Sequence, residues 1–243
     1  DGVVLDGIVM EPPKKSRVAL VWVHGLTSFF CSSQPLIREL SGLAAKDGIG
    51  YFKFNTRGHD VVARGQGKHA LLGTIYEKFE DCIHDIRAMI AYAQKLGYQK
   101  IILAGHSTGA NKALYYLYKT RDPSVKGLVL LGAASDISAE IKRVGKSTFE
   151  KDLCLAQRLN RRNPFALFES KKYLFTAQRA LSLFTAGAAE DVFPYYNPKA
   201  SWKELRNIRV PIAVIFGSRD ECLDRPAQRI IDIFRANVPL AKS

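Results

Sequence analysis

The sequence predicts an α/β fold in which helices cover both faces of a doubly wound, mostly parallel sheet, with a helical insertion late in the chain. Short, wholly apolar runs alternate with helical patterns along the chain. Apolar runs without polar alternation are typical of parallel strands that are buried on both faces. In addition, about 70 residues separate the last two runs, whereas a plain crossover needs about 12–30.

The strands are expected in a simple order. Residues 3–10, which precede Pro12-Pro13, predict an antiparallel edge strand. The alternation of strand and helix that follows favours right-handed crossovers between parallel neighbours. The parallel strands are expected at 18–23, 51–54, 101–104, 128–131 and 212–216.

The clearest amphipathic helix is expected over 75–96, where apolar residues recur every three or four positions. The charged residues expected on its other side are Glu77, Lys78, Glu80, Asp81 and Asp85. Another helix is expected over 226–234, near the end of the chain.

The long interval over 137–206 contains helical patterns near 153–159 and 173–184. A structureless loop of this length is uncommon in a compact domain, so a helical insertion is expected here. The domain prediction is therefore a sheet core made by 1–136 and 207–243, interrupted by an insertion at 137–206.

Composition excludes several classes of protein. The chain has 243 residues, a length that suits one large domain, and 47% of them are hydrophobic, as in ordinary globular proteins. No apolar run is long enough to span a bilayer. The net charge is +13, but Lys and Arg are spread along the chain without a basic block, so a solvated surface is favoured over nucleic-acid binding.

Cysteines and histidines give no metal signal. The four cysteines lie far apart without a CxxC pair, and the five histidines lack the spacing of zinc ligands. The cysteines are expected to be reduced thiols in a cytoplasmic protein.

The segment 104–110, Ala-Gly-His-Ser-Thr-Gly-Ala, follows a buried strand and opens a helix. It is a G-x-S-x-G turn in the strand–turn–helix context that the motif requires. A tight turn would raise the Ser107 hydroxyl above the sheet, while Gly105 and Gly109 would allow strand and helix to approach. A glycine-rich turn with an incidental serine is the alternative. A phosphate loop fits less well, because Lys112 comes three residues after Gly109.

On these residues the sequence resembles the α/β-hydrolase superfamily over essentially its whole length. Residues 23–27, Val-His-Gly-Leu-Thr, resemble the loop that completes the oxyanion hole in that superfamily, which implies the N–H groups of Leu26 and Thr108 as donors. Residues 217–221, Gly-Ser-Arg-Asp-Glu, resemble the turn that carries the triad acid, which implies Asp220. The insertion lies where the superfamily places a substrate-covering cap. The turn at 55–60 departs from the superfamily's R-G-x-G-x-S pattern and is given no catalytic role.

Other titratable residues remain alternatives to these assignments. Asp136, which follows a strand, is the second candidate for the triad acid, and Glu221 is expected to meet solvent. His24 is expected to orient the oxyanion loop by hydrogen bonds, and His106 to pack under the turn. The remaining histidines, expected to be surface or structural, are His59, His69 and His84.

The resemblance implies a serine hydrolase that cleaves carboxylic esters through an acyl-enzyme on Ser107, with an acyl pocket under the cap. The expected partner is a small-molecule ester, no cofactor or metal is implied, and the sequence gives no oligomeric state. A hydrolase of small amides or peptides with the same residues, and a non-catalytic binding module of the same fold, are the alternatives.

The general base is the missing member of this set. Triad residues in this superfamily follow the order Ser, acid, His, and no histidine follows Ser107 in these 243 residues. We therefore expect a catalytic histidine beyond Ser243, with a further strand and helix that would cover the 212–216 strand. A complete reading frame that ends at Ser243 would favour the binding module instead.

Overall fold

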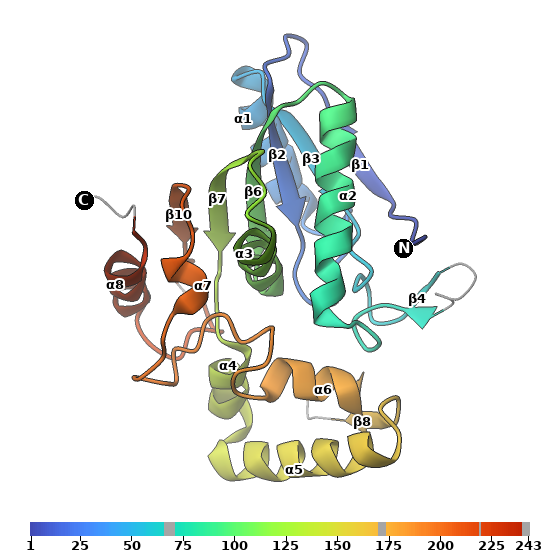
Figure 1. Ribbon diagram of the computed structural model, residues 1–243, viewed down its shortest axis with the longest axis vertical. Coiled ribbons are helices and arrows are strands. Elements are labelled where there is room, and N and C mark those ends of the chain that lie inside the picture. The colour runs from blue at the N-terminus through green and yellow to red at the C-terminus, as the bar shows by residue number, and fades with distance from the viewer. Residues whose placement is uncertain (66–70, 170–173, 219, 240–243) are drawn as a thin grey trace.

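The computed structural model describes residues 1–65, 71–169, 174–218 and 220–239. The predicted strands form a six-stranded sheet in the order β1-β3-β2-β6-β7-β10 (Figure 1). All neighbours are parallel except β1, which pairs antiparallel with β3 at one edge, as predicted. The strand bounds are β1 Gly7–Met10, β2 Val18–Val23, β3 Gly50–Phe54, β6 Lys100–His106, β7 Val125–Leu131 and β10 Ile212–Ile215.

Both faces of the sheet are covered, as the apolar runs predicted. Along β2, Val21 and Val23 belong to the main hydrophobic cluster beneath α2 and α3, whereas Trp22 packs with Ile37 of α1 on the other face. The run lacks polar residues because each face of the strand meets a helix layer. The helices around the sheet are α1 Gln34–Lys46, α2 Cys82–Lys95, α3 Thr108–Thr120, α7 Lys203–Arg206 and α8 Ala227–Asn237.

The helix expected over 75–96 begins later than predicted. A short 3₁₀ turn, Phe79–Asp81, precedes α2, and Ile75 instead accepts hydrogen bonds from the N–H and Oγ1 of Thr176, at 3.2 and 2.7 Å. The backbone of Ile75 therefore serves a distant segment rather than a helix. The expected solvent-facing charges are also partly wrong, because Glu77 and Asp85 are buried and ion-paired.

The insertion forms a separate layer at the carboxyl ends of the strands (Figure 1). The helix expected from residue 173 begins only at Ala177, because Leu174–Thr176 forms a strand and Tyr173 lies outside the described residues. The elements of this layer are α4 Asp136–Val144, α5 Lys146–Arg162, β8 Leu167–Glu169, β9 Leu174–Thr176 and α6 Ala177–Phe184. A second small hairpin, from the sheet domain, consists of β4 Ala63–Arg64 and β5 Leu71–Leu72.

The last part of the expected insertion packs into the core of the sheet domain. Phe193, Tyr195, Trp202 and Leu205 all belong to the main hydrophobic cluster, and the Tyr195 hydroxyl donates to the Ala133 carbonyl at 2.9 Å. By contrast, α5, α6 and the β8–β9 hairpin share a smaller cluster, which meets the sheet domain at Ile75. Only the part before about residue 190 is thus a distinct layer, which we call the cap.

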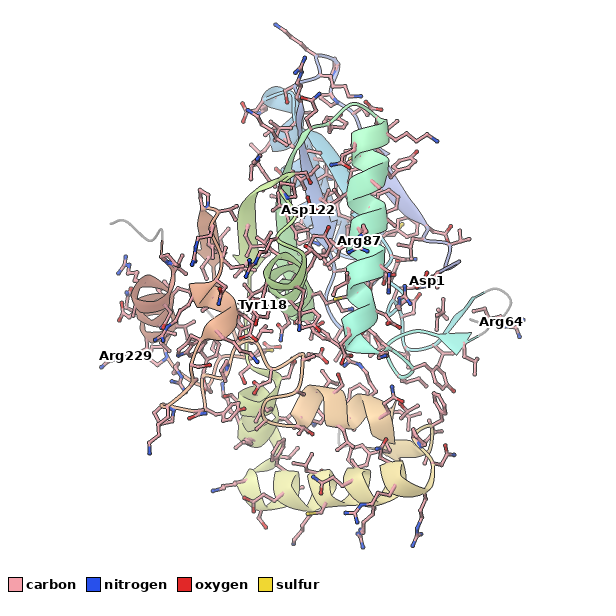
Figure 2. All side chains as sticks on the ribbon, viewed as in Figure 1. Asp1, Arg64, Arg87, Tyr118, Asp122 and Arg229 are labelled. Carbon is pink, nitrogen blue, oxygen red and sulfur yellow. The ribbon has the colours of Figure 1, made fainter. Side chains whose placement is uncertain are left out.

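Basic side chains are distributed around the surface, as the sequence predicted. Arg64 and Arg229, for example, lie at opposite sides of the molecule and are exposed (Figure 2). Within the described residues, no helix is long and apolar enough to cross a membrane.

Candidate active site

Ser107 is the single residue between the end of β6 and the start of α3, and its backbone angles are φ 53° and ψ −128°. This conformation is strained for any residue with a Cβ atom. It is held from both sides, because the Ser107 N–H donates to the Leu131 carbonyl at 2.9 Å and the Ser107 carbonyl accepts the Ala110 N–H at 2.8 Å. The strain is therefore a fixed property of this turn.

Gly105 and Gly109 allow the close contacts that the motif predicted. A Cβ atom on Gly105 would lie 2.1 Å from the Gly109 carbonyl oxygen, and one on Gly109 would lie 2.3 Å from the Val23 carbonyl oxygen. Both distances are far inside van der Waals contact with backbone that cannot move aside. Strand β6, helix α3 and the end of β2 consequently meet at a spacing that only glycine permits.

The loop after β2 lies directly against the serine. A Cβ atom on Gly25 would be 3.0 Å from Ser107 Cβ and 3.5 Å from its Oγ. Two N–H groups that follow Leu26 in this loop already have partners. The Thr27 N–H donates to Thr74 Oγ1 at 2.9 Å, and the Ser28 N–H donates to the Gly25 carbonyl at 3.2 Å. Leu26 and Thr108, the predicted oxyanion donors, line one cavity with Ser107.

His24 orients this loop and is electrically neutral. Its Nε2 accepts the Thr56 N–H at 2.9 Å, which places the proton on Nδ1, where it is donated to the Gly25 carbonyl at 2.9 Å. Burial, and then the nearby Lys112 ammonium, lower the pKa of His24 to about 3. These contacts fit the orienting role expected for His24, and neither ring nitrogen is available for proton transfer.

Ser107 lies between two hollows. One, which we call the serine cavity, has a volume of about 340 Å³ and is walled by Leu26 and Thr108 on the sheet side and by Phe175, Leu183 and Phe184 of the cap. The other, which we call the acid hollow, is a more open space of about 640 Å³ beside the sheet. It is lined by His106, Ser107, Leu131, Gly132, Gly217, Ser218, Asp220, Glu221 and Cys222.

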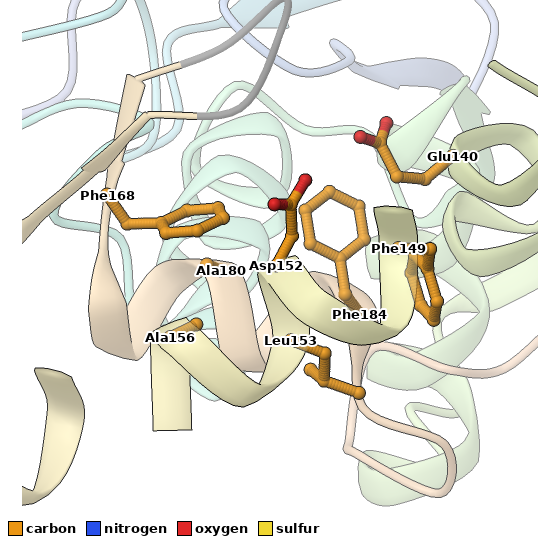
Figure 3. A pocket seen from close by; sticks show the side chains of 8 residues that line it. All are labelled: Glu140, Phe149, Asp152, Leu153, Ala156, Phe168, Ala180 and Phe184. Carbon is orange, nitrogen blue, oxygen red and sulfur yellow. The ribbon is translucent and has the colours of Figure 1, made fainter. Parts of the chain in front are cut away.

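The interior of the cap itself offers little room. Phe149, Phe168 and Phe184 fill the space between α5 and α6, leaving a void of about 10 Å³ (Figure 3). That is about enough for one water molecule. Phe184 borders both this void and the serine cavity. Of these two spaces on the cap side, only the serine cavity can hold a ligand.

Asp220 lines the acid hollow and accepts the Cys222 N–H at 3.0 Å. Asp136, the second candidate acid, borders the serine cavity at the first residue of α4, where Asn111 Nδ2 lies 3.4 Å from its Oδ2. Burial, and then the nearby Glu190, raise the pKa of Asp136 to about 8. A carboxyl that keeps its proton at neutral pH cannot stabilise an imidazolium, so the electrostatics favour Asp220.

The Asp136→Asn variant tests this protonation. The native pKa of about 8 lies above the ordinary value of 3.8, so the native state holds a proton that the unfolded chain releases above about pH 4. The carboxyl therefore contributes stability at low pH that is lost as the pH rises towards 8. We expect the Asp136→Asn protein to melt increasingly above wild type between pH 5 and 9. A difference in Tm that does not change with pH would show that Asp136 is ionised in the native state.

His106 and Glu221 border the acid hollow beside Ser107 and Asp220, whereas His59 and His84 do not line it. Partial burial lowers the pKa of His106, and the nearby Asp220 carboxylate opposes that shift. His106 was expected under the turn, and this is wrong: its ring is exposed, lines the acid hollow and stacks 6.5 Å from Trp22. It lies at the end of β6 on the face of Trp22, opposite to the face on which α3 packs. His59 contacts Asp60 at 2.8 Å, His84 is exposed, as is Glu221, and His69 lies outside the described residues.

Sequence reasoning missed a set of buried charges behind the serine: Glu77, Lys112, Arg179 and Glu190. The signal for Lys112 was its place in a helix that is otherwise apolar on the same side. Glu77 had no such signal, because helical periodicity placed it towards solvent. In the described part of the chain, no group of His, Cys, Asp and Glu side chains could hold a metal ion.

Comparisons with known proteins agree with the fold. Residues 14–172 match the family described as serine aminopeptidase, S33. No curated protein matches the chain. Among solved structures, Est1E from Butyrivibrio proteoclasticus with bound ferulic acid is 19% identical, with a TM-score of 0.63 over 98% of this chain and 83% of the other.

Two further structures have the same fold. A soluble variant of monoglyceride lipase from Saccharomyces cerevisiae, in complex with a substrate analogue, is 16% identical, with a TM-score of 0.66 over 99% of this chain and 81% of the other. The siderophore hydrolase EstB from Aspergillus fumigatus is 16% identical, with a TM-score of 0.65 over 96% and 84%. The family match spans more than half of the chain, which therefore belongs to the serine aminopeptidase S33 family of α/β-hydrolases.

Proposed function

We propose that this protein is a serine hydrolase that cleaves carboxylic esters of small molecules through an acyl-enzyme on Ser107. The observation that carries the proposal is the strained Ser107, which lines one cavity together with Leu26 and Thr108. A nucleophile beside two backbone donors is the arrangement that acyl transfer needs. That relatives of this fold are named as esterases and lipases supports the same reaction class.

In the proposed reaction, Ser107 Oγ attacks the acyl carbon while a base takes its proton. The negative oxygen that forms would be held by the N–H groups of Leu26 and Thr108, and by the positive end of α3. The alcohol leaves with the proton from the base, and water then releases the acid from the serine. An imidazole oriented by the Asp220 carboxylate across the acid hollow would serve as this base.

The cap would shape the acyl pocket. Phe175, Leu183 and Phe184 give the serine cavity an apolar wall, which suits a hydrocarbon or aromatic acyl group. Lys142 and Arg143 of α4 also border the cavity. Arg143 pairs with Glu140, whereas the Lys142 ammonium donates to the carbonyls of Glu221 and Leu223 at 3.0 and 2.8 Å. Lys142 thus holds α4 to the turn that carries Asp220, while Arg143 pairs within α4.

Labelling with a fluorophosphonate probe tests the proposal directly. An activated Ser107 should be labelled in the wild-type protein, and mass spectrometry of the digested protein should place the adduct on that residue. A binding module of the same fold would leave Ser107 unlabelled under the same conditions, and that result would overturn the proposal.

The description of the family favours a second candidate, the hydrolysis of small amides or peptides with the same residues. An amide needs its leaving amine to be protonated, which makes a matched ester and amide of one acyl group a sharp comparison. We expect the ester to have the larger kcat/KM. Faster turnover of the amide would make the protein a peptidase or amidase.

Asp220→Asn should lower kcat by about 10³-fold or more, because the amide no longer fixes the tautomer of the base or stabilises its charged form. Glu221→Gln is the matched control: its side chain is exposed and only its carbonyl is used. We expect it to stay within about threefold of wild type, as is typical of exposed substitutions. A large loss in Asp136→Asn, with Asp220→Asn active, would move the acid to Asp136.

A further inference from the structure

The buried charged side chains behind Ser107 form a continuous network, which we call the buried charge network. Lys112 Nζ lies 2.5 Å from Glu77 Oε1, and Arg179 Nη2 lies 3.3 Å from Glu77 Oε2. Arg179 also makes a two-pronged pair with Glu190, in which Nη2 donates to Oε1 at 3.0 Å. None of the four side chains is more than 1% exposed. The two positive and two negative side chains of this network balance each other's charge without solvent.

The buried charge network connects the cap to α3, the helix that begins directly after Ser107. Arg179 is on α6, the cap helix whose Leu183 and Phe184 wall the serine cavity. Lys112 is on α3, one turn after Ser107. Glu77, from the segment before α2, stands between them and contacts both. The Arg179–Glu77 ion pair is therefore the contact of this set that joins the cap to the sheet domain.

From Lys112 the contacts continue to the oxyanion loop. Lys112 Nζ donates to Thr56 Oγ1 at 3.3 Å, and the Thr56 N–H donates to His24 Nε2 at 2.9 Å. His24 Nδ1–H in turn donates to the Gly25 carbonyl. That carbonyl belongs to the same planar peptide unit as the Leu26 N–H, so its orientation also sets the direction of the proposed donor.

Burial and the charges around His24 keep the ring neutral, and only a neutral ring can accept the Thr56 N–H at Nε2. Lys112 from α3 and Lys53 from β3 lower the pKa of His24, Glu77 raises it, and burial lowers it most. A second proton on Nε2 would oppose the Thr56 N–H and disturb the peptide. Lys112, which pairs with Glu77, thus adds to the effect of burial on His24, and it contacts the Thr56 side chain whose N–H holds the ring.

Stability alone does not account for such a set. Taking four charges out of water is costly, and buried ion pairs can often be replaced by apolar side chains without loss of stability. The cap already has its own apolar contacts, in which Ala156, Phe168, Phe175 and Leu183 pack with Ile75 of the sheet domain. The Arg179–Glu190 pair instead fixes the direction of the Arg179 guanidinium, whose ion pair with Glu77 then links α6 to the Glu77–Lys112 pair on α3.

We infer that Arg179 is a positioning residue for the reaction, because it couples the cap through Glu77, Lys112, Thr56 and His24 to the peptide that presents the Leu26 N–H. The inference rests on the proposed function. It means that the cap acts on the rate of the chemical step as well as on the binding of substrate.

The test compares Arg179→Met with Arg179→Lys and with Phe149→Leu. Methionine removes the charge at nearly constant length, and lysine restores the charge without the two-pronged geometry. Phe149 packs in the cap against Phe184 but lies outside the buried charge network, so Phe149→Leu controls for a general loosening of the cap. Two readouts are taken: kcat and KM for an ester, and the ¹⁵N signals of the His24 ring.

For Arg179→Met we expect kcat to fall by about tenfold with KM within about threefold, the range of coupling seen through packed networks. The His24 signals should shift from those of the wild-type Nδ1–H form. Arg179→Lys should recover most of the loss in both readouts, and Phe149→Leu should leave kcat and the His24 signals close to wild type.

Equal losses in Arg179→Met and Phe149→Leu, or a change confined to KM with unchanged His24 signals, would overturn the inference. If Arg179→Met fails to fold, Arg179→Gln, which also removes the charge but keeps a polar side chain, replaces it in the same two readouts with the same expected and contradicting results. The His24 signals do not depend on turnover. They therefore test the coupling even if fluorophosphonate leaves wild-type Ser107 unlabelled, a result that would count against the proposed function alone.

Discussion

The Ser107→Ala variant is expected to lose at least about 10³-fold in kcat, because no other hydroxyl replaces the nucleophile at the turn. Folding should be preserved, since the Ser107 side chain is small and the turn is held by backbone hydrogen bonds to Leu131 and Ala110. The measurement is kcat for an activated ester, with circular dichroism to show that the fold is retained. Activity comparable to wild type would remove Ser107 from the mechanism.

Ser107→Gly is the matched control for this experiment. Glycine lacks the hydroxyl as alanine does, but it adopts φ 53° and ψ −128° without the clash of a Cβ atom. Strain of this kind costs about 1–3 kcal/mol, partly offset by the greater freedom of glycine in the unfolded chain. We expect the Ser107→Gly protein to be as inactive as Ser107→Ala but more resistant to urea. The reverse order of stability would show that the turn is unstrained.

The second large effect is expected for Gly105→Ala. The new methyl group would lie 2.1 Å from the Gly109 carbonyl oxygen and 2.6 Å from the Ala110 nitrogen, so strand β6 and helix α3 would have to separate. We expect a loss of more than about 4 kcal/mol in the free energy of unfolding, in the range reserved for severe backbone or core conflicts. Any protein that folds should also be inactive, because Ser107 would be displaced.

Gly127→Ala on the neighbouring strand β7 is the control for that prediction. A Cβ atom at this position would meet the Pro211 carbonyl oxygen at 3.9 Å, which is ordinary contact. We expect its free energy of unfolding to stay within about 1 kcal/mol of wild type, since alanine also restricts the unfolded chain. Urea denaturation of both variants separates the two cases. Equal stabilities would mean that β6 and α3 do not approach as closely as described.

The sheet could be predicted because its signal is local. Residues 18–23 are apolar without interruption, and the strand that they form is covered by helices on both faces. The turn at Ser107 was equally predictable, because both of its glycines are required by contacts within the turn or with the adjoining loop. Local sequence therefore specified most of the sheet and the position of Ser107 at the turn.

The errors arose where distant segments decide the structure. Ile75 has helical spacing to Phe79, yet its carbonyl is taken by Thr176, about 100 residues away. Glu77 has the pattern of a surface residue, but Lys112 and Arg179 enclose it. A single strand or helix pattern carries no record of such partners, because they come from distant parts of the chain. The coupling of the cap to the serine could only be seen once both layers were in place.

The return of the cap into the sheet domain limits how this protein can be recombined. Tyr195 lies between Phe193 and Trp202, and Phe193 also packs against Phe234 of α8, so these rings complete the interior of the sheet domain. A chimera that exchanged the whole of 137–206 would import a foreign piece of that interior. Exchange of a cap between members of the fold should therefore end near residue 189, leaving the aromatic segment with its original domain. Variation in substrate range could then evolve in the first part of the insertion while the second part stays tied to the fold.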